Sequence, residues 1–360
     1  ADLAFGLRLG ELTASPANET ANATATVHHP GFPKQPFDDG WAQKWYRRWW
    51  NCKPQEVPLP QEEDPEGKLQ YVHVVYSADE KELPGVLLSM TSMSRHLRKP
   101  EECVVHLIVA KEVKPKAEKM LECFQRTISE TGTLPKVFVH TMFQPNIRLS
   151  EMKSDQPFRK DLIMPNTFVR FYLHQYMPHA RRAVWLDADT IVRADVAELY
   201  RMRLRNTSVA AMLPEAGQVQ MGKLLEAEVK GEYPFKNEEY NTGVILFDLD
   251  RWRLDNYTEE AEYWTHHFFA LGGDQVGLNM AVINKVDKIP DWRWNTRGFQ
   301  FGRLPWRCVN GSKIMHWSGS REKVQKPWLI GKDGTSRARF RYDVIEPYVL
   351  DPPCNLGGSP

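Results

Sequence analysis

Short apolar runs alternate with amphipathic segments through the middle of the chain. The runs are rich in valine, isoleucine and aromatic residues, as buried strands are, and predict strands over residues 71–77, 103–110, 136–141, 183–186, 208–213, 243–249 and 313–319. The amphipathic segments predict helices over residues 114–128, 167–177 and 274–283, and another with Val86, Met90, Met93 and Leu97 on one face. Strands that alternate with crossover helices indicate an α/β fold, a Rossmann-like, mostly parallel sheet with flanking helices. Such sheets bind ligands at the carboxyl edge of their strands.

Residues 1–68 differ in composition from the rest of the chain. Two polar, proline-containing stretches, at residues 14–36 and 54–68, indicate a stem or linker. Between them the segment Trp41–Trp50 carries four tryptophans, which we expect to pack on the main domain, with ligand binding as the alternative. We therefore expect a stem at residues 1–68, a main domain at 69–330 and a C-terminal tail at 331–360.

Composition narrows the classes of function. The 47 lysine and arginine residues balance 46 aspartate and glutamate residues, so the net charge of +1 gives no electrostatic basis for nucleic-acid binding and favours a small-molecule partner. No stretch approaches the roughly 20 apolar residues that a membrane span needs. The chain opens with Ala1 rather than methionine, which is compatible with the removal of a signal peptide or membrane anchor.

Glycosylation sequons suit a chain of the secretory pathway, with the Golgi lumen as the expected compartment and the cytoplasm as the alternative. Asn-x-Ser/Thr sequons occur at Asn18, Asn22, Asn206, Asn256 and Asn310. The cysteines are Cys52, Cys103, Cys123, Cys308 and Cys354. They have no metal-ligand spacing and permit at most two disulfides with one thiol left over, and free buried thiols are the alternative.

Two aspartates stand where the apolar run at residues 183–186 ends. On an extended segment, residues two apart project to the same side, so the carboxylates of Asp187 and Asp189 can converge just beyond the strand. Two anions so placed call for a cation, and oxygen ligands suit Mg²⁺ or Mn²⁺, which can also bridge to a nucleotide diphosphate. Aspartate is also common in turns and helix caps, so the pair alone leaves a structural role open.

Five separated motifs occur in one order between Val72 and Trp328. They are VVYSADE, TFVRFYL, WLDADTIV, YNTGVILFDLDRW followed by GGDQVGLN, and MHWSGSREKVQKPW. With them the chain resembles glycosyltransferase family 8, which includes glycogenin, bacterial lipopolysaccharide galactosyltransferases and plant galacturonosyltransferases. The resemblance implies the GT-A form of the Rossmann-like fold, a UDP-sugar donor and a glycan, polysaccharide or glycoprotein acceptor. It also implies transfer with retention of configuration at the anomeric carbon.

The resemblance assigns a divalent metal to three side chains. Asp187 and Asp189, with Ala188 between them in the same motif, would hold the ion together with His316. An imidazole beside two carboxylates favours Mn²⁺ over Mg²⁺. A lone histidine is more often structural, so the assignment of His316 depends on the motif.

The resemblance also assigns residues to the nucleotide, namely Ser77, Ala78, Asp79, Arg170, Gly319 and Lys326. Ser77 and Asp79 can hydrogen-bond the uracil; a helix cap is the alternative for Asp79, but the helix is expected to start later, near Pro84. The donor fork of Arg170 suits a phosphate or sugar hydroxyl, with a structural ion pair as the alternative. Lys326 would offset charge on the leaving diphosphate, although an insertion leaves Lys323 as a competitor.

Four further residues would surround the transferred sugar. Asn241 and Thr242 precede an apolar run and offer an amide and a hydroxyl, or form a simple turn. Asp274 and Gln275 stand at a helix start, where relatives hold the sugar beside its anomeric carbon, and Asp274 can equally be an N-cap. Asn241, Asp274 and Gln275 are the expected catalytic residues, with Asp274 the better nucleophile if a covalent intermediate forms.

Two rival functions stay open. WLDADTIV also fits the signature of haloacid-dehalogenase-type phosphatases, in which the first aspartate is a nucleophile, but that motif normally lies on the first strand of its domain. The other rival is a non-catalytic, sugar-binding relative of the same fold, and the presence of all the expected metal ligands argues against it. The motifs do not decide between glucose, galactose, xylose, glucuronate and galacturonate as the transferred sugar.

Overall fold

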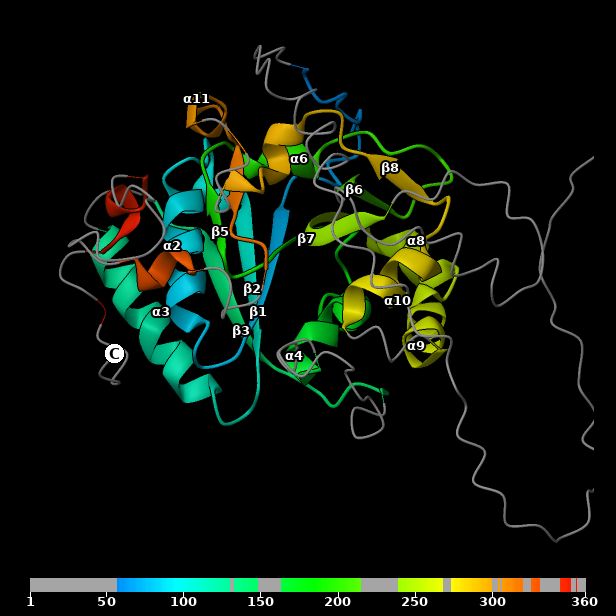
Figure 1. Ribbon diagram of the computed structural model, residues 1–360, viewed down its shortest axis with the longest axis horizontal. Helices are drawn as coiled ribbons and strands as arrows, with labels where there is room; N and C mark the ends of the chain where they lie inside the picture. The colour runs from blue at the N-terminus through cyan, green and yellow to red at the C-terminus, as the bar shows by residue number, and fades with distance from the viewer. Residues whose placement is uncertain are drawn as a thin grey trace, which may run out of the picture. The chain divides into compact units, whose positions relative to one another are not determined.

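A seven-stranded sheet forms the centre of the protein (Figure 1). The computed structural model describes residues 57–129, 133–147, 163–214, 239–267, 273–299, 304, 306–319, 325–330, 344–350 and 354. The strands of this sheet are β1 (Val72–Ala78), β2 (Cys103–Val109), β3 (Lys136–Thr141), β4 (Arg182–Leu186), β6 (Ala210–Pro214), β7 (Tyr240–Asp248) and β8 (Val286–Lys288). Their order is β3-β2-β1-β4-β7-β6-β8, and only β7 runs antiparallel to its neighbours. The predicted mostly parallel α/β sheet is confirmed.

Burial along the strands follows their place in the sheet. All residues of β2 are buried, because helices or neighbouring segments cover both faces of a central parallel strand. The edge strand β3 alternates instead, and Lys136 and Phe138 are exposed on it. The short strand β8 was not predicted, because three residues are too few to show a period of two.

Helices lie on both sides of the sheet (Figure 1). The helices α2 (Leu83–Ser94) and α3 (Lys114–Ser129) lie on one side; α8 (Leu249–Leu254), α9 (Tyr257–His267) and α10 (Asp274–Ala281) lie on the other. Val86, Met90 and Met93 are fully buried on α2, as their spacing predicted. The shorter helical segments are η1 (Pro100–Glu102), α6 (Val196–Tyr200), η6 (Trp292–Asn295), α11 (Trp306–Asn310), η8 (Pro327–Leu329) and η10 (Glu346–Tyr348).

The single helix predicted over residues 167–177 is wrong in detail. The segment forms three consecutive short turns, α4 (Pro165–Phe168), the 3₁₀ turn η4 (Val169–Tyr172) and α5 (Leu173–Tyr176). Every residue of η4 is buried, so the segment has neighbours on all sides rather than one apolar face. Tertiary packing therefore determines its backbone more than helical periodicity does.

A second, two-stranded sheet joins distant parts of the chain. It pairs β5 (Thr190–Val192) with β9 (Ile314–His316) in antiparallel register, so that Thr190 lies opposite His316. Strand β9 is shorter than the predicted strand over residues 313–319. This small sheet brings the acidic motif after β4 and the histidine of the last motif together.

The described ends of the chain pack against the main domain. Within residues 57–68, Leu59 is buried and the Glu62 carboxylate forms ion pairs with Arg181 and Arg182. Near the C-terminus Cys354 forms a disulfide with Cys123. The predicted boundaries at residues 68 and 330 stay predictions, and the tryptophans of Trp41–Trp50 lie outside the described residues.

The remaining cysteines fit the expected number of bridges. Cys308 is also disulfide-bonded, and Cys103 is a free, buried thiol. Cys52 lies outside the described residues. Among the described helices, none combines the length and the apolarity that crossing a bilayer requires.

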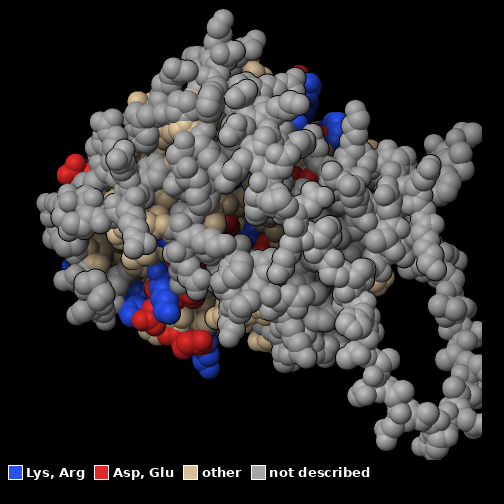
Figure 2. Space-filling view, viewed as in Figure 1, with Lys and Arg blue, Asp and Glu red and all other residues tan. Residues whose placement is uncertain are grey.

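Charged side chains of both signs lie next to one another on the described surface (Figure 2). Lys116 forms an ion pair with Glu80, and Lys114 pairs with Glu118 one helical turn away. Such exposed pairs contribute little to stability. They do fit the near-zero net charge of the chain.

Candidate active site

Asp187 and Asp189 occupy the turn between β4 and β5. The Asp187 N–H donates to the carbonyl of Gly243 at 2.9 Å, which extends the pairing of β4 with β7 beyond the end of β4. The Thr190 hydroxyl donates to the Asp187 carbonyl at 2.9 Å and closes the turn. The side chain of Asp187 is 30% exposed and that of Asp189 is 12% exposed, so the first carboxylate is reachable from solvent and the second lies deeper.

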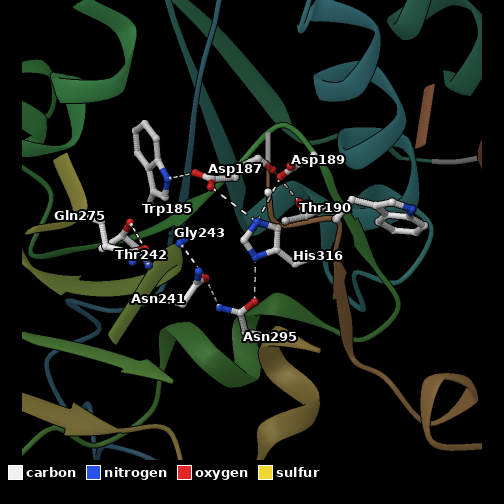
Figure 3. Close-up of polar contacts among 12 residues, drawn as sticks. Trp185, Asp187, Asp189, Thr190, Asn241, Thr242, Gly243, Gln275, Asn295 and His316 are labelled. Atoms are coloured by element: carbon white, nitrogen blue, oxygen red, sulfur yellow. Dashed lines mark hydrogen bonds and ion pairs between the residues drawn. The ribbon is translucent and has the colours of Figure 1, made fainter. Parts of the chain in front are cut away.

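His316 faces both carboxylates (Figure 3). Its Nε2 atom lies 3.2 Å from Oδ1 of Asp189 and 3.6 Å from Oδ2 of Asp187. One ligand atom from each of the three residues lies within 4.8 Å of the other two. Two carboxylate oxygens and one imidazole nitrogen that converge in this way suit a divalent cation such as Mn²⁺, so the donor set fits the expected metal.

A buried lysine stands beside the deeper aspartate. Lys326 Nζ lies 2.5 Å from Oδ2 of Asp189 and donates to the carbonyls of Trp317 at 2.9 Å and Gly319 at 2.6 Å. Burial alone would raise the pKa of Asp189, but the Lys326 ammonium and the His316 imidazole hold it well below its usual range. Lys326, which the resemblance assigns to the diphosphate, thus lies beside the Asp189 carboxylate. Its competitor Lys323 lies outside the described residues.

Arg170 is enclosed among protein groups. Its guanidinium lies 4.4 Å from the ring centre of Trp185 and donates to the Thr242 carbonyl at 2.6 Å. It also forms ion pairs with Asp187 at 3.2 Å and with Asp274 at 2.9 Å. Arg170 therefore forms structural ion pairs that join the two acidic motifs, and its assignment to a phosphate or sugar hydroxyl stays a prediction.

The first residues of β7 and α10 meet through the side chains of Thr242 and Gln275. Thr242 lies at the start of β7, and both its N–H and its hydroxyl lie 3.3 Å from Oε1 of Gln275. The Gln275 Nε2 group donates to the buried carboxylate of Glu239 at 2.7 Å. Both ends of the Gln275 amide are therefore held, which fixes its orientation.

Asp274 is the first residue of α10 and is not its N-cap. Gly273 takes the cap position with φ 84°, a left-handed conformation that favours glycine. The side chain of Asp274 instead pairs with Arg170 and is buried. A carboxylate in the first turn of a helix is also stabilised by the helix dipole.

The residues predicted to bind uracil lie at the carboxyl end of β1. Ser77 and Ala78 are the last residues of β1 and are buried. The Asp79 carboxylate accepts the Glu82 N–H at 2.9 Å, and the Asp79 N–H donates to the Glu82 carboxylate at 3.3 Å. Asp79 and Glu82 thus close the turn that leads into α2. The helix itself begins at Leu83, close to the expected start.

Three site residues were missed by the sequence. Trp185 donates its indole N–H to Asp187 at 2.8 Å. A Cβ on Gly243 would lie 2.1 Å from Cε1 of His316, so only glycine leaves room for the imidazole. Asn295 accepts from Nδ1 of His316 at 2.9 Å. The sequence signal for Gly243 is its position directly after Asn241 and Thr242 at the start of an apolar run. No local pattern in the sequence marks Asn295.

Comparison with known proteins matches this arrangement to one family. The model described as "Glycosyl transferase family 8" matches residues 73–330. The Arabidopsis thaliana protein named "Probable galacturonosyltransferase-like 3" is 28% identical over 291 residues, which are 76% of this chain and 78% of that protein. "Glycosyltransferase 8 domain-containing protein 1" of Danio rerio is 24% identical over 286 residues, 71% of this chain and 74% of that protein.

Solved structures share the fold. The galactosyltransferase LgtC, crystallised with donor and acceptor sugar analogues, superposes with a TM-score of 0.53 at 17% sequence identity, covering 80% of this chain and 98% of that one. The glycosyltransferase GlyE of Streptococcus pneumoniae superposes with a TM-score of 0.51 at 17% identity, covering 78% of this chain and 60% of that one. At such identities the similarity supports the GT-A fold.

Proposed function

Because the chain belongs to glycosyltransferase family 8, we propose that it is a UDP-sugar-dependent, retaining glycosyltransferase that requires a divalent cation. Sugar transfer from a donor to a glycan acceptor follows from the family. The observation that carries the proposal is the convergence of Asp187, Asp189 and His316 just beyond the carboxyl end of β4. In open α/β sheets this edge is where ligands bind.

The three residues would hold Mn²⁺ in preference to Mg²⁺. Mg²⁺ favours oxygen ligands, whereas the Nε2 atom of His316 supplies a nitrogen ligand that suits Mn²⁺ better. A cation bound there supplies Lewis-acid stabilisation of negative charge on a diphosphate. The carboxylates of Asp187 and Asp189 would hold the cation.

The other charged and polar residues would orient the substrate. Lys326 would transfer one of its hydrogen bonds from Asp189 to the departing diphosphate and offset its charge. Asn241 and Gln275 would bind sugar hydroxyls beside the anomeric carbon. The ion pair of Asp274 with Arg170 supports a positioning role for this carboxylate, because a paired carboxylate is a weaker nucleophile.

One rival function is disfavoured by the fold. Asp187 follows β4, which three parallel strands precede in the chain, whereas the phosphatase motif belongs on the first strand. In addition, the Asp187 carboxylate is engaged by Arg170 and Trp185. A non-catalytic sugar-binding protein is the candidate that the experiment has to separate.

The test is a donor panel. Protein and Mn²⁺ are mixed with UDP-glucose, UDP-galactose, UDP-xylose, UDP-glucuronate and UDP-galacturonate, and UDP release is measured with and without glycan acceptors. The names of the plant relatives make UDP-galacturonate one of the first donors to try. Turnover with one donor, with a product of unchanged anomeric configuration by NMR, supports the proposal. Donor binding without hydrolysis or transfer would identify a sugar-binding protein instead.

The metal requirement has its own variant. Asp189→Asn keeps the shape of the side chain and removes one ligand charge, so we expect turnover and Mn²⁺-dependent UDP binding to fall by about a hundredfold or more. Asp250→Asn is the matched control, because Asp250 is 58% exposed on α8 and forms an ion pair with Arg253 on the same helix. Full activity of Asp189→Asn, or of the native protein in excess chelator, contradicts the metal role.

We also propose that the protein works in the secretory pathway. The Cys123–Cys354 disulfide and the bonded state of Cys308 support an oxidising compartment. The sequon residues Asn206 and Asn256 are exposed, as glycosylation requires. A mobility shift on treatment with peptide-N-glycosidase is expected for protein from a eukaryotic secretory host, and no shift would count against this location.

A further inference from the structure

Asn295 lies between His316 and Asn241, and its side chain contacts both. Its side chain, at the end of η6, is 1% exposed. Its Oδ1 atom lies 2.9 Å from Nδ1 of His316, and its Nδ2 atom donates to Oδ1 of Asn241 at 2.8 Å (Figure 3). All three side chains are buried, with exposures of 1%, 2% and 4% for Asn295, His316 and Asn241.

One backbone donor fixes the direction of every hydrogen bond in this chain of contacts. The Gly243 N–H points to the Asn241 side chain at 3.1 Å, and a backbone N–H can only donate, so the atom that it meets must be the amide oxygen of Asn241. That oxygen in turn requires a donor from Asn295, which is its Nδ2 group. The remaining end of Asn295 is an oxygen, so Nδ1 of His316 must carry a proton.

The backbone holds Asn295 firmly in this position. The residue after it, Thr296, donates its N–H to the Ile314 carbonyl and accepts the N–H of His316, both at 2.9 Å. The end of η6 is therefore tied to β9 on either side of Met315, and one of the two bonds is to His316 itself. These two hydrogen bonds limit how far the backbone at Asn295 can move relative to His316.

We propose that Asn295 is a positioning residue that holds His316 in the Nδ1-protonated form, with the Nε2 lone pair directed at Asp187 and Asp189. A hydrogen-bond partner on the second nitrogen is what sets ring orientation and ligand basicity at metal-bound histidines, and its loss typically weakens metal binding by about 10–100-fold. Through the same amide Asn295 also holds the oxygen of Asn241. It therefore links the metal side of the site to the sugar side. This inference depends on the metal site proposed above.

The first measurement is Mn²⁺ affinity without any donor, followed by electron paramagnetic resonance or calorimetry. Asn295→Leu removes both hydrogen bonds at similar volume, and we expect about 10–100-fold weaker Mn²⁺ binding. Asn279→Leu is the matched control: Asn279 is also a buried amide, but its bonds go to Tyr240 and the Gln275 carbonyl. We expect this control to bind Mn²⁺ as the native protein does.

Asn295→Asp separates the two functions of the amide. A carboxylate oxygen still accepts from Nδ1 of His316, so Mn²⁺ affinity should stay within about threefold of the native value. The same carboxylate cannot donate to Asn241, so the KM for the UDP-sugar should rise by about fivefold to tenfold. If Asn295→Leu does not fold, this variant decides, and a loss of Mn²⁺ affinity of tenfold or more overturns the inference.

Nitrogen-15 NMR of histidine-labelled protein with Mg²⁺ tests the tautomer directly. The His316 signals are assigned by their loss in His316→Gln, and a proton on Nδ1 is expected. A proton on Nε2, or native Mn²⁺ affinity in Asn295→Leu, overturns the inference while leaving the metal site in place. Failure of the native protein to bind Mn²⁺ contradicts the proposed function itself.

Discussion

Acidification should destabilise the folded protein through His106, a buried residue of β2 that is not among the candidate active-site residues. His106 is the middle member of a chain of three imidazoles across β1, β2 and β3. Nδ1 of His73 lies 3.0 Å from Nε2 of His106, and Nδ1 of His106 lies 2.9 Å from Nε2 of His140. Burial, with smaller contributions from His73 and His140, lowers the pKa of His106 to about 3. The folded protein therefore holds this ring neutral at pH values where an unfolded histidine is charged.

The size of the effect follows from the two pKa values. The unfolded ring takes up a proton below about pH 6.5, whereas the folded ring stays neutral down to about pH 3. In this window the unfolded state binds more protons, so stability falls as the pH falls. Well below pH 6.5 each further pH unit costs about 1.4 kcal/mol, which gives about 2 kcal/mol of lost unfolding free energy between pH 7 and pH 5.

The assay is urea unfolding of the native protein and of His106→Gln from pH 7 to pH 5. Glutamine is polar and has no titration in this range, so the native protein should lose about 2 kcal/mol more than the variant over the window. His73 and His140 remain in both proteins, so their contributions largely cancel in the comparison. Equal pH slopes for the two proteins would refute the buried neutral state of His106.

Three further predictions concern single residues. A Cβ at position 243 would lie 2.1 Å from Cε1 of His316 and 2.8 Å from Oδ2 of Asp187. Gly243→Ala should therefore weaken Mn²⁺ binding by about tenfold or more in calorimetry, and unchanged affinity contradicts this close approach of residue 243 to His316. Arg170→Met removes the arginine partner of Asp187 and Asp274, so the free energy of unfolding, measured by urea denaturation, should fall by about 3 kcal/mol. An unchanged midpoint of the urea unfolding transition would count against the ion pairs. Burial raises the pKa of the Cys103 thiol, so Ellman's reagent should not modify it at pH 8 until denaturant is added; rapid labelling of the native protein would show it to be accessible.

Several site residues were predictable because their signals are local. The doublet of Asp187 and Asp189 directly follows an apolar run, and residues two apart on an extended chain share a side. Asn241 and Thr242 likewise precede the apolar part of β7. For these residues sequence spacing is a good guide to position, since a few bonds of nearly fixed geometry connect them.

Other features were beyond the reach of a single sequence. Asn295 belongs to a short 3₁₀ turn without periodicity, and its role depends on partners from β7 and β9. The role of Arg170 was open because either a phosphate or a carboxylate satisfies a guanidinium. Only packing places Asp187 and Asp274 on either side of it.

The sequence by itself determined the fold class, most strands of the main sheet, and the family that its motifs resemble. These properties depend on the period of apolar residues and on short runs of letters, which are local. The tertiary structure alone decided which polar groups meet, such as His316 with Asp189 and Asn295 with both His316 and Asn241. A buried polar group must find a partner, and that partner is chosen by the packing of distant segments rather than by neighbours in the chain.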